Sequence, residues 1–237
     1  MICDIHHHIV YGVDDGAKDR EMSILMLEKA VSEGVTHLVC SSHITPGQPS
    51  LNIDRYLRHF DDLCNIVEER NLGLRLYTGS EIMYSEYTAK GLKAGEVPTL
   101  AATWTVLVEF WPDVTFDVIK RAAADLMNEG FGMVCAHVER FACLREGDRL
   151  AELRDRYLVK TQMNGSTILH SHDFFGDRWV KRVLHDDLID IAGSDAHNVD
   201  SRCCKLGQVY DFLQKHYGNE RAEDLCWNHP AELLQLK

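Results

Sequence analysis

The sequence lacks the features of membrane-spanning, exported and multidomain proteins. It has no apolar run approaching the roughly 18 residues of a membrane-spanning helix, and no basic N-terminal segment followed by an apolar stretch and a cleavage site. Only 5 of its 237 residues are proline, and no Pro/Gly/Ser-rich linker or internal repeat divides the chain. We therefore expect a soluble, cytoplasmic protein without membrane insertion, folded as a single domain over residues 1–237.

Positive charge is also scarce. The chain has 25 Lys and Arg residues against 37 Asp and Glu residues, which gives a formal net charge of -12. A surface with this balance repels nucleic acid and anionic lipid at long range, so we expect no nucleic-acid partner. A phosphate-bearing ligand would need a local source of positive charge, which the overall count does not show.

Paired cysteine motifs are absent. The 8 cysteines form no CxxC pair and most stand within or beside apolar stretches, which is typical of buried thiols in a reducing compartment. Cys64 and Arg70 have the Cys-x5-Arg spacing of phosphatases with a cysteine nucleophile. The residues between them include two acids and no glycine, and they continue a helical pattern, whereas that chemistry needs a loop of backbone N–H groups. We attribute this spacing to chance.

Short apolar runs alternate with amphipathic helical patterns along the whole chain. The expected strands cover Ile2–Ile5, His37–Cys40, Leu74–Thr78, Thr105–Val108, Gly132–Ala136, Lys160–Asn164 and Leu188–Ala192. The expected helices lie at Ile24–Ala30, Ile53–Arg70, Val118–Leu126, Leu150–Tyr157, Trp179–Leu184 and Leu206–Phe212. Seven βα units predict an α/β fold with parallel strands, and this length favours a closed or nearly closed barrel. No GxGxxG follows the first strand, which argues against a dinucleotide-binding sheet.

Metal-binding side chains follow six of the seven expected strands. The set contains five imidazoles and four carboxylates: His6, His8, Asp15, His43, Glu81, Glu109, His137, Asp195 and His197. The carboxyl ends of barrel strands meet at one face, so we expect these residues to converge there. A single such residue is more often an ordinary polar side chain, and the recurrence at strand ends is what favours a site. The mixture suits Mn, Fe or Zn better than Ca, and it exceeds the needs of one ion, so we expect two or three.

The other histidines give weaker signals. His59, His185 and His216 lie in helical patterns among charged neighbours, and we expect them to be solvated. His170 and His172 follow the sixth strand and stay unassigned. The HHH triplet lies within a strand pattern, so we interpret it as part of the fold rather than as an affinity-tag remnant.

Six motifs, in this order along the chain, resemble those of a known superfamily: DIHHHIVYGVDDGA, SSH, GSEI, LVEF, AHVER and GSDAHN. They resemble the polymerase and histidinol phosphatase (PHP) superfamily, and closely resemble its bacterial manganese-dependent protein-tyrosine phosphatases of capsule and exopolysaccharide operons. The resemblance covers essentially the whole chain and implies a PHP-type distorted (β/α)7 barrel with the metal site at the carboxyl ends of the strands.

The resemblance also implies roles for individual residues. It assigns the nine residues to three Mn²⁺ ions, with Glu81 bridging two of them, and it assigns Arg140 and Arg202 to the phosphate. The first ion would be held by His6, His8, Glu81 and Asp195, the second by Glu81, Glu109 and His137, and the third by Asp15, His43 and His197. The chain departs from the family pattern where His7, Ser42, Ile44 and Val138 stand.

Three functions stay open from the sequence. The first is a metal-dependent tyrosine phosphatase that acts by attack of an activated water; the resemblance implies that its substrate is the phosphotyrosine tail of a bacterial tyrosine kinase in capsule synthesis. The second is a small-molecule phosphatase, such as one acting on histidinol phosphate, and the third is a metal-bearing regulator without turnover. Compact length favours the first over the second, and an intact ligand set argues against the third. The sequence leaves the oligomeric state open.

Overall fold

The computed structural model describes residues 1–48, 51–173 and 176–236. The strands are β1 (Ile2–His7), β2 (Val35–Ile44), β3 (Arg75–Met83), β4 (Thr105–Glu109), β5 (Gly132–Cys135), β6 (Lys160–Asn164) and β7 (Ile191–Gly193). The longer helices are α1 (Arg20–Ser32), α2 (Ile53–Glu69), α4 (Phe116–Asn128), α5 (Arg149–Tyr157), α7 (Arg178–His185) and α8 (Leu206–Tyr217). Shorter helices are α3 (Thr88–Lys93), α6 (Gly165–His170), α9 (Asn219–Glu223) and α10 (His229–Leu233), and a 3-10 turn spans Val138–Arg140.

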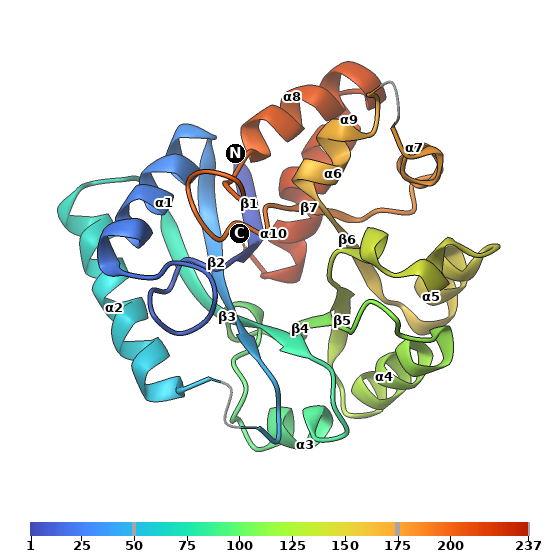
Figure 1. Cartoon of the computed structure of the whole chain (residues 1–237), viewed down its shortest axis with the longest axis horizontal. Coiled ribbons are helices and arrows are strands. Elements are labelled where there is room, and N and C mark those ends of the chain that lie inside the picture. The colour runs from blue at the N-terminus through green and yellow to red at the C-terminus, as the bar shows by residue number, and fades with distance from the viewer. Residues whose placement is uncertain (49–50, 174–175, 237) are drawn as a thin grey trace.

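The strands form one parallel barrel that is almost closed. Their order in the sheet is β1-β2-β3-β4-β5-β6-β7, with every pair parallel, and the helices surround them in Figure 1. β7 returns to β1 through an isolated parallel bridge between His7 and Ala196 and a hydrogen bond from the Asp195 N–H to the His6 carbonyl, 2.8 Å. The predicted order of parallel βα units is therefore confirmed.

β2 and β3 extend further at their carboxyl ends than the sequence predicted. β2 and β3 pair without interruption from His37 with Arg75 to Ile44 with Ile82, so their ladder continues beyond Cys40, where the apolar run ends. Because this backbone pairing is continuous, the polar residues near the carboxyl ends of β2 and β3 keep a strand conformation. β7 begins later than predicted, because the Leu188 N–H bonds the Val183 carbonyl in the turn that ends α7.

The apolar core has two parts, one inside the barrel and one beneath the helices. The inner part is small and includes Ile5, Val39, Leu107 and Val134, all of them fully buried. The larger part joins the outer faces of the strands to the helices. The cysteines are free, and most are buried as expected. Over the described residues, no helix combines the length and the apolar character that a membrane crossing requires.

A bulge interrupts the pairing of β1 with β2. Asp4 pairs with Leu38, and the next partners are His7 and Cys40, so three steps on β1 match two on β2. His7 is fully buried and its two ring nitrogens have no hydrogen-bond partner. Burial lowers the pKa of His7 to about 3, so its ring is neutral.

The bulge sets which side chains of β1 face the barrel mouth. Ile5 belongs to the inner core, so strict alternation would turn the next residue, His6, outward. The extra residue turns His6 and His8 inward, and their Nε2 atoms lie 3.1 and 3.2 Å from Oε2 of Glu81. His6 and His8 therefore face the mouth of the barrel because of this bulge.

Candidate metal centre

The first group of candidate ligands is buried and comes from the end of β1 and the residue after it, from β3 and from the loop after β7. Oδ1 of Asp195 lies 3.5 Å from His6 Nε2 and 3.6 Å from His8 Nε2, and both histidines also contact Glu81. The four ligand atoms lie within 4.8 Å of one another. This spacing is suited to a single ion at their centre.

A second group lies beside it, around Glu81 and Glu109. Nδ1 of His43 is 2.8 Å from Glu109 Oε1 and 3.2 Å from Glu81 Oε2. Nε2 of His137 is 2.8 Å from Glu81 Oε1 and 3.7 Å from Glu109 Oε2. Glu81 therefore faces both groups, one oxygen toward His137 and the other toward His6 and His8.

The third group opens to solvent. Oδ1 of Asp15 lies 3.4 Å from His43 Nε2 and 3.3 Å from His197 Nε2, and the Asp15 side chain is 64% exposed. His8 completes this group. With it, the structure brings together all nine candidate ligands that the sequence singled out.

Their placement differs in detail from the expectation that ligands follow the strands. His43, Glu81 and Glu109 lie within the last three residues of β2, β3 and β4. His137 and Asp195 do follow strands, and both have left-handed backbones, with φ of 31° and 51°. Such backbones are uncommon for residues other than glycine and concentrate at functional sites.

Asp14 and residues of β6 support the candidate ligands, and sequence reasoning missed their part. Asp14 Oδ2 lies 2.9 Å from His8 Nδ1 and accepts the His43 N–H at 3.1 Å. Gln162 Oε1 lies 3.0 Å from His6 Nδ1. Asn164 donates from Nδ2 to Asp195 Oδ2 at 2.8 Å. The sequence did contain one signal for Gln162 and Asn164: they are polar residues two positions apart in a buried strand, so their side chains point to the same side.

The electrostatics of the site are dominated by alternating imidazoles and carboxylates. Burial opposes ionisation of Glu81, yet the surrounding histidines hold its pKa well below the usual range. Burial alone would lower the pKa of His8, but Asp14 and Glu81 raise it to about 10. His197 shifts the other way, to about 4, because burial and the charge of His8 both lower its pKa. The pKa values of these neighbouring imidazoles thus shift in opposite directions, because a charge on His8 disfavours a second charge on His197.

The donor set fits divalent metal ions. His6 Nε2, His8 Nε2, His197 Nε2 and Glu81 Oε2 are buried and have no hydrogen-bond partner of acceptable geometry, although they face one another across the site. Buried polar atoms are otherwise nearly always paired, and imidazoles anchored at one nitrogen and free at the other are the usual arrangement around a metal. Carboxylates mixed with imidazoles suit Mn, Fe and Zn.

Arg140 and Arg202 flank the site on the side of Asp195. The Arg140 guanidinium pairs with Asp195 Oδ2, and Arg202 Nη2 lies 3.0 Å from Oδ1. Both arginine side chains are more than 40% exposed, so they reach from the ligands toward solvent. They bring positive charge to a chain that is acidic overall.

Comparison with known proteins identifies the family. Residues 2–235 match the model of a family described as capsular polysaccharide synthesis, CpsB/CapC. The chain belongs to this family. It is 32% identical to the tyrosine-protein phosphatase CpsB of Streptococcus pneumoniae over 98% of this chain and 97% of that protein. The resemblance drawn from the motifs is therefore confirmed.

Solved structures agree with the barrel. The chain superimposes with a TM-score of 0.87 and 26% identity on a structure from work on YwqE from Bacillus subtilis and CpsB from Streptococcus pneumoniae, described as unique metal-dependent tyrosine phosphatases, covering 99% of this chain and 94% of the other. A histidinol phosphate phosphatase from Lactococcus lactis has a TM-score of 0.56 at 12% identity, covering 93% of each chain. The latter similarity shows the fold alone.

In this CpsB/CapC protein, the Cys-x5-Arg spacing has no role in a site. Cys64 lies within the continuous helix α2, and Arg70 caps its end and pairs with Glu28 at 2.7 Å. Burial and the charges of Asp61 and Glu68 raise the pKa of Cys64, the opposite of what a nucleophilic thiolate needs.

The remaining histidines of this family member contribute no ligand to the three groups. His185 is 85% exposed as expected, but His59 is half-buried and stacks on Tyr11 at 4.0 Å between ring centroids, so its expected solvation was wrong. His170 contacts Asp173 and His172 contacts the Tyr217 hydroxyl.

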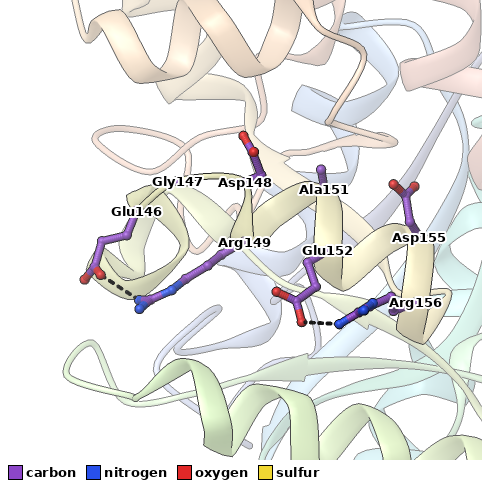
Figure 2. A pocket seen from close by; sticks show the side chains of 8 residues that line it. All are labelled: Glu146, Gly147, Asp148, Arg149, Ala151, Glu152, Asp155 and Arg156. Carbon is purple, nitrogen blue, oxygen red and sulfur yellow. Dashed lines mark hydrogen bonds and ion pairs between the residues drawn. The ribbon is translucent and has the colours of Figure 1, made fainter.

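A wider hollow lies elsewhere on the molecule. Its volume is about 630 Å³. It lies along α5, as Figure 2 shows. Four of its charged groups form ion pairs, Glu146 with Arg149 and Glu152 with Arg156. None of the nine candidate ligands lines it, so we interpret it as a solvated helix face.

Proposed function

We propose that this chain is a metal-dependent protein-tyrosine phosphatase that hydrolyses the phosphate ester by attack of water. The observation that carries the proposal is the convergence of five imidazoles and four carboxylates beside two arginines. The similar proteins from Streptococcus pneumoniae and other bacteria, named tyrosine-protein phosphatases, support the same substrate class. Attack by water needs no covalent phosphoenzyme, and Cys64 does not serve as a nucleophile because it lies within a helix.

The three groups of side chains would together hold two or three divalent ions, with Glu81 shared between two of the groups. The proposed ligand sets are His6, His8, Glu81 and Asp195; Glu81, Glu109 and His137; and Asp15, His43 and His197. Mn²⁺ is the proposed metal, with two or three ions per chain, and Fe and Zn suit the same donors. When bound, such ions supply Lewis acidity, which activates water as a nucleophile and offsets the negative charge of a phosphate.

The arginines bind and orient the phosphoryl group. A guanidinium offers a planar pair of N–H donors that matches two phosphate oxygens. Asp195 is shared between the candidate ligands and both arginines, so Arg140 and Arg202 are held beside the reacting centre. Their charge draws a phosphate dianion to a mouth that the surrounding acidic surface would otherwise repel.

The substrate is a phosphotyrosine-bearing protein in capsule synthesis. The proposed source is the tail of a bacterial tyrosine kinase, because a tail presents tyrosines without surrounding structure. The partly exposed Asp15 and arginines leave the mouth open to a segment of another chain. This openness favours a protein substrate over a small phosphate ester enclosed by the site.

The test is phosphate release from a phosphotyrosyl peptide and from histidinol phosphate by the Mn²⁺-loaded protein. Faster hydrolysis of the peptide is expected, and an equal or faster rate on histidinol phosphate would overturn the assignment. His137→Ala and Asp195→Asn are expected to abolish turnover, while Cys64→Ser keeps it. Loss of activity in Cys64→Ser with retention in His137→Ala would refute the metal-dependent mechanism.

A further inference from the structure

A small cavity adjoins the candidate metal centre at Asp195. Its volume is about 160 Å³, and it is lined by groups that include Arg140, Arg202, Lys205, Asp195, Ser166 and Ser201. Two of these, Arg140 and Asp195, come from loops after β5 and β7, and Lys205 directly precedes α8. The cavity therefore connects the reacting centre to the start of a helix that the proposed mechanism does not use.

The charge of the lining is positive. Three cationic residues and one carboxylate line the cavity, and that carboxylate, Asp195, is also shared with the buried histidines of the first group. Serine hydroxyls complete the polar lining. Cations beside hydroxyl donors form a site for a tetrahedral oxyanion.

The size of the cavity sets what can enter it. Its volume of about 160 Å³ is below the roughly 300 Å³ of pockets that enclose a whole drug-sized ligand. This volume is enough for a phosphoryl group but not for the tyrosine ring and peptide as well. The ester oxygen and the ring would thus remain outside, above the cavity.

Lys205 occupies a position that does not favour helix stability. It is the N-cap of α8 and makes no side-chain cap hydrogen bond. A helix N-terminus carries partial positive charge and prefers Ser, Thr, Asp or Asn as its cap. The carboxylate near this end, Glu33, is already engaged by Lys29 at 2.5 Å and by Gln208. Over the described ranges of the chain, Lys205 itself makes no ion pair.

We propose that Lys205 binds the phosphoryl group of the substrate as a third cation beside Arg140 and Arg202. This inference rests on the proposed phosphatase function and deepens it by naming a further binding residue. Among the residues that the structure describes, the lysine side chain makes no ion pair, it lines the cavity beside both arginines, and the positive end of α8 adds to the same field. A phosphate dianion supplies the charge that this arrangement lacks.

The test compares wild type, Lys205→Met, Lys205→Arg and Lys215→Met, each saturated with Mn²⁺ and checked for metal content. Lys215 lies in the last turn of α8 and is exposed, so its variant is the matched control. The first readout is binding of inorganic phosphate, followed as the rise in Tm with phosphate concentration, which needs no turnover. The second is the KM and kcat for a phosphotyrosyl peptide.

Lys205→Met is expected to bind phosphate about tenfold more weakly and to raise KM by a similar factor, with no fall in the Tm of the phosphate-free protein. Lys205→Arg is expected to retain binding within about threefold, and Lys215→Met to behave as wild type. Unchanged phosphate binding in Lys205→Met, or an equal loss in Lys215→Met, would overturn the inference.

The two proposals fail separately. If the wild type binds phosphate through Lys205 but does not hydrolyse phosphotyrosyl peptide, the phosphatase assignment fails and Lys205 stands as a phosphate-binding residue only. If the peptide is hydrolysed and Lys205→Met binds phosphate normally, the phosphatase assignment stands and the role of Lys205 fails.

Discussion

The side-chain oxygen of Gln162 lies 3.0 Å from Nδ1 of His6, and it also accepts the backbone N–H of His137 at 2.8 Å. One carboxamide on β6 thus holds two candidate ligands that come from β1 and from the loop after β5. The contact fixes Nδ1 of His6 as the protonated nitrogen and leaves Nε2 directed at Glu81. The two donors need an acceptor at this place, so the position is specified by hydrogen bonding as well as by packing.

We predict that Gln162→Leu weakens metal binding. The substitution keeps much of the side-chain volume but removes the acceptor for His6 and for the His137 N–H. Loss of a group that orients a metal-binding histidine typically lowers metal affinity or activity by about 10- to 100-fold. Metal content after dialysis against a graded chelator series measures the effect. Gln214→Leu, on the exposed end of α8, is the control, and equal metal retention in the two variants would contradict the prediction.

Asp14→Asn is predicted to have a similar effect through His8. The carboxylate of Asp14 contacts His8 Nδ1 at 2.9 Å, and an amide in its place would support the ring less strongly. We expect about a 10- to 100-fold loss in activity at limiting Mn²⁺, with partial recovery when Mn²⁺ is raised. Steady-state rates across a Mn²⁺ series test this. Asp113→Asn, at an exposed position after β4, should behave as wild type.

The sequence allowed the ligands to be named but not the groups that hold them. His43, Glu81 and Glu109 could be predicted because the barrel carries the ends of all its strands to one face, whatever the spacing between them in the chain. Gln162 could not, because a glutamine in a buried strand is not a metal-ligand residue type. Its role depends on which residues lie opposite it across the barrel.

Local backbone geometry was the other part that could not be predicted. Alternation of side chains places His6 and His8 on the same side of β1 but does not say which side, and the bulge decides it. The short helices α3, α6, α9 and α10 were missed because segments of five or six residues are too short to show a helical period. The longer helices were found because their apolar residues repeat over two or more turns.

Gly16→Ala is predicted to displace His8. A Cβ at position 16 would lie 2.2 Å from the His8 carbonyl oxygen and 2.5 Å from the His8 Cβ, so the loop or the strand end has to move. We expect a destabilisation of about 1–3 kcal/mol together with weaker metal binding. Thermal unfolding and metal titration measure both. Gly132→Ala is the control because the nearest atom to its added Cβ is 3.6 Å away, and a normal metal affinity in Gly16→Ala would count against the model of the site.

The opposite end of the barrel carries a charge cluster that should govern stability without affecting catalysis. Asp190 precedes β7, is buried, and accepts hydrogen bonds from the Thr161 N–H at 2.9 Å and from Arg154 Nη2 at 3.0 Å. Burial opposes its ionisation, but Arg154 and the Thr161 N–H hold its pKa below the usual value. Because the folded-state pKa lies below the unfolded-state value of about 3.9, the stabilisation is present above about pH 4 and is lost as pH falls through the folded-state pKa.

Asp190→Asn is therefore predicted to lower the free energy of unfolding by about 3–5 kcal/mol at pH 7, since it leaves Arg154 without its buried partner. The difference from wild type should shrink as pH falls below about 4, where the wild-type carboxylate also becomes protonated. Urea unfolding at a series of pH values measures it, with Asp211→Asn on the exposed face of α8 as the control. The kcat of the folded Asp190→Asn protein at pH 7 should stay within about twofold of wild type, because β7 separates Asp190 from Asp195. A fall in kcat as large as that of Asp195→Asn would show that the two ends of the barrel are not independent.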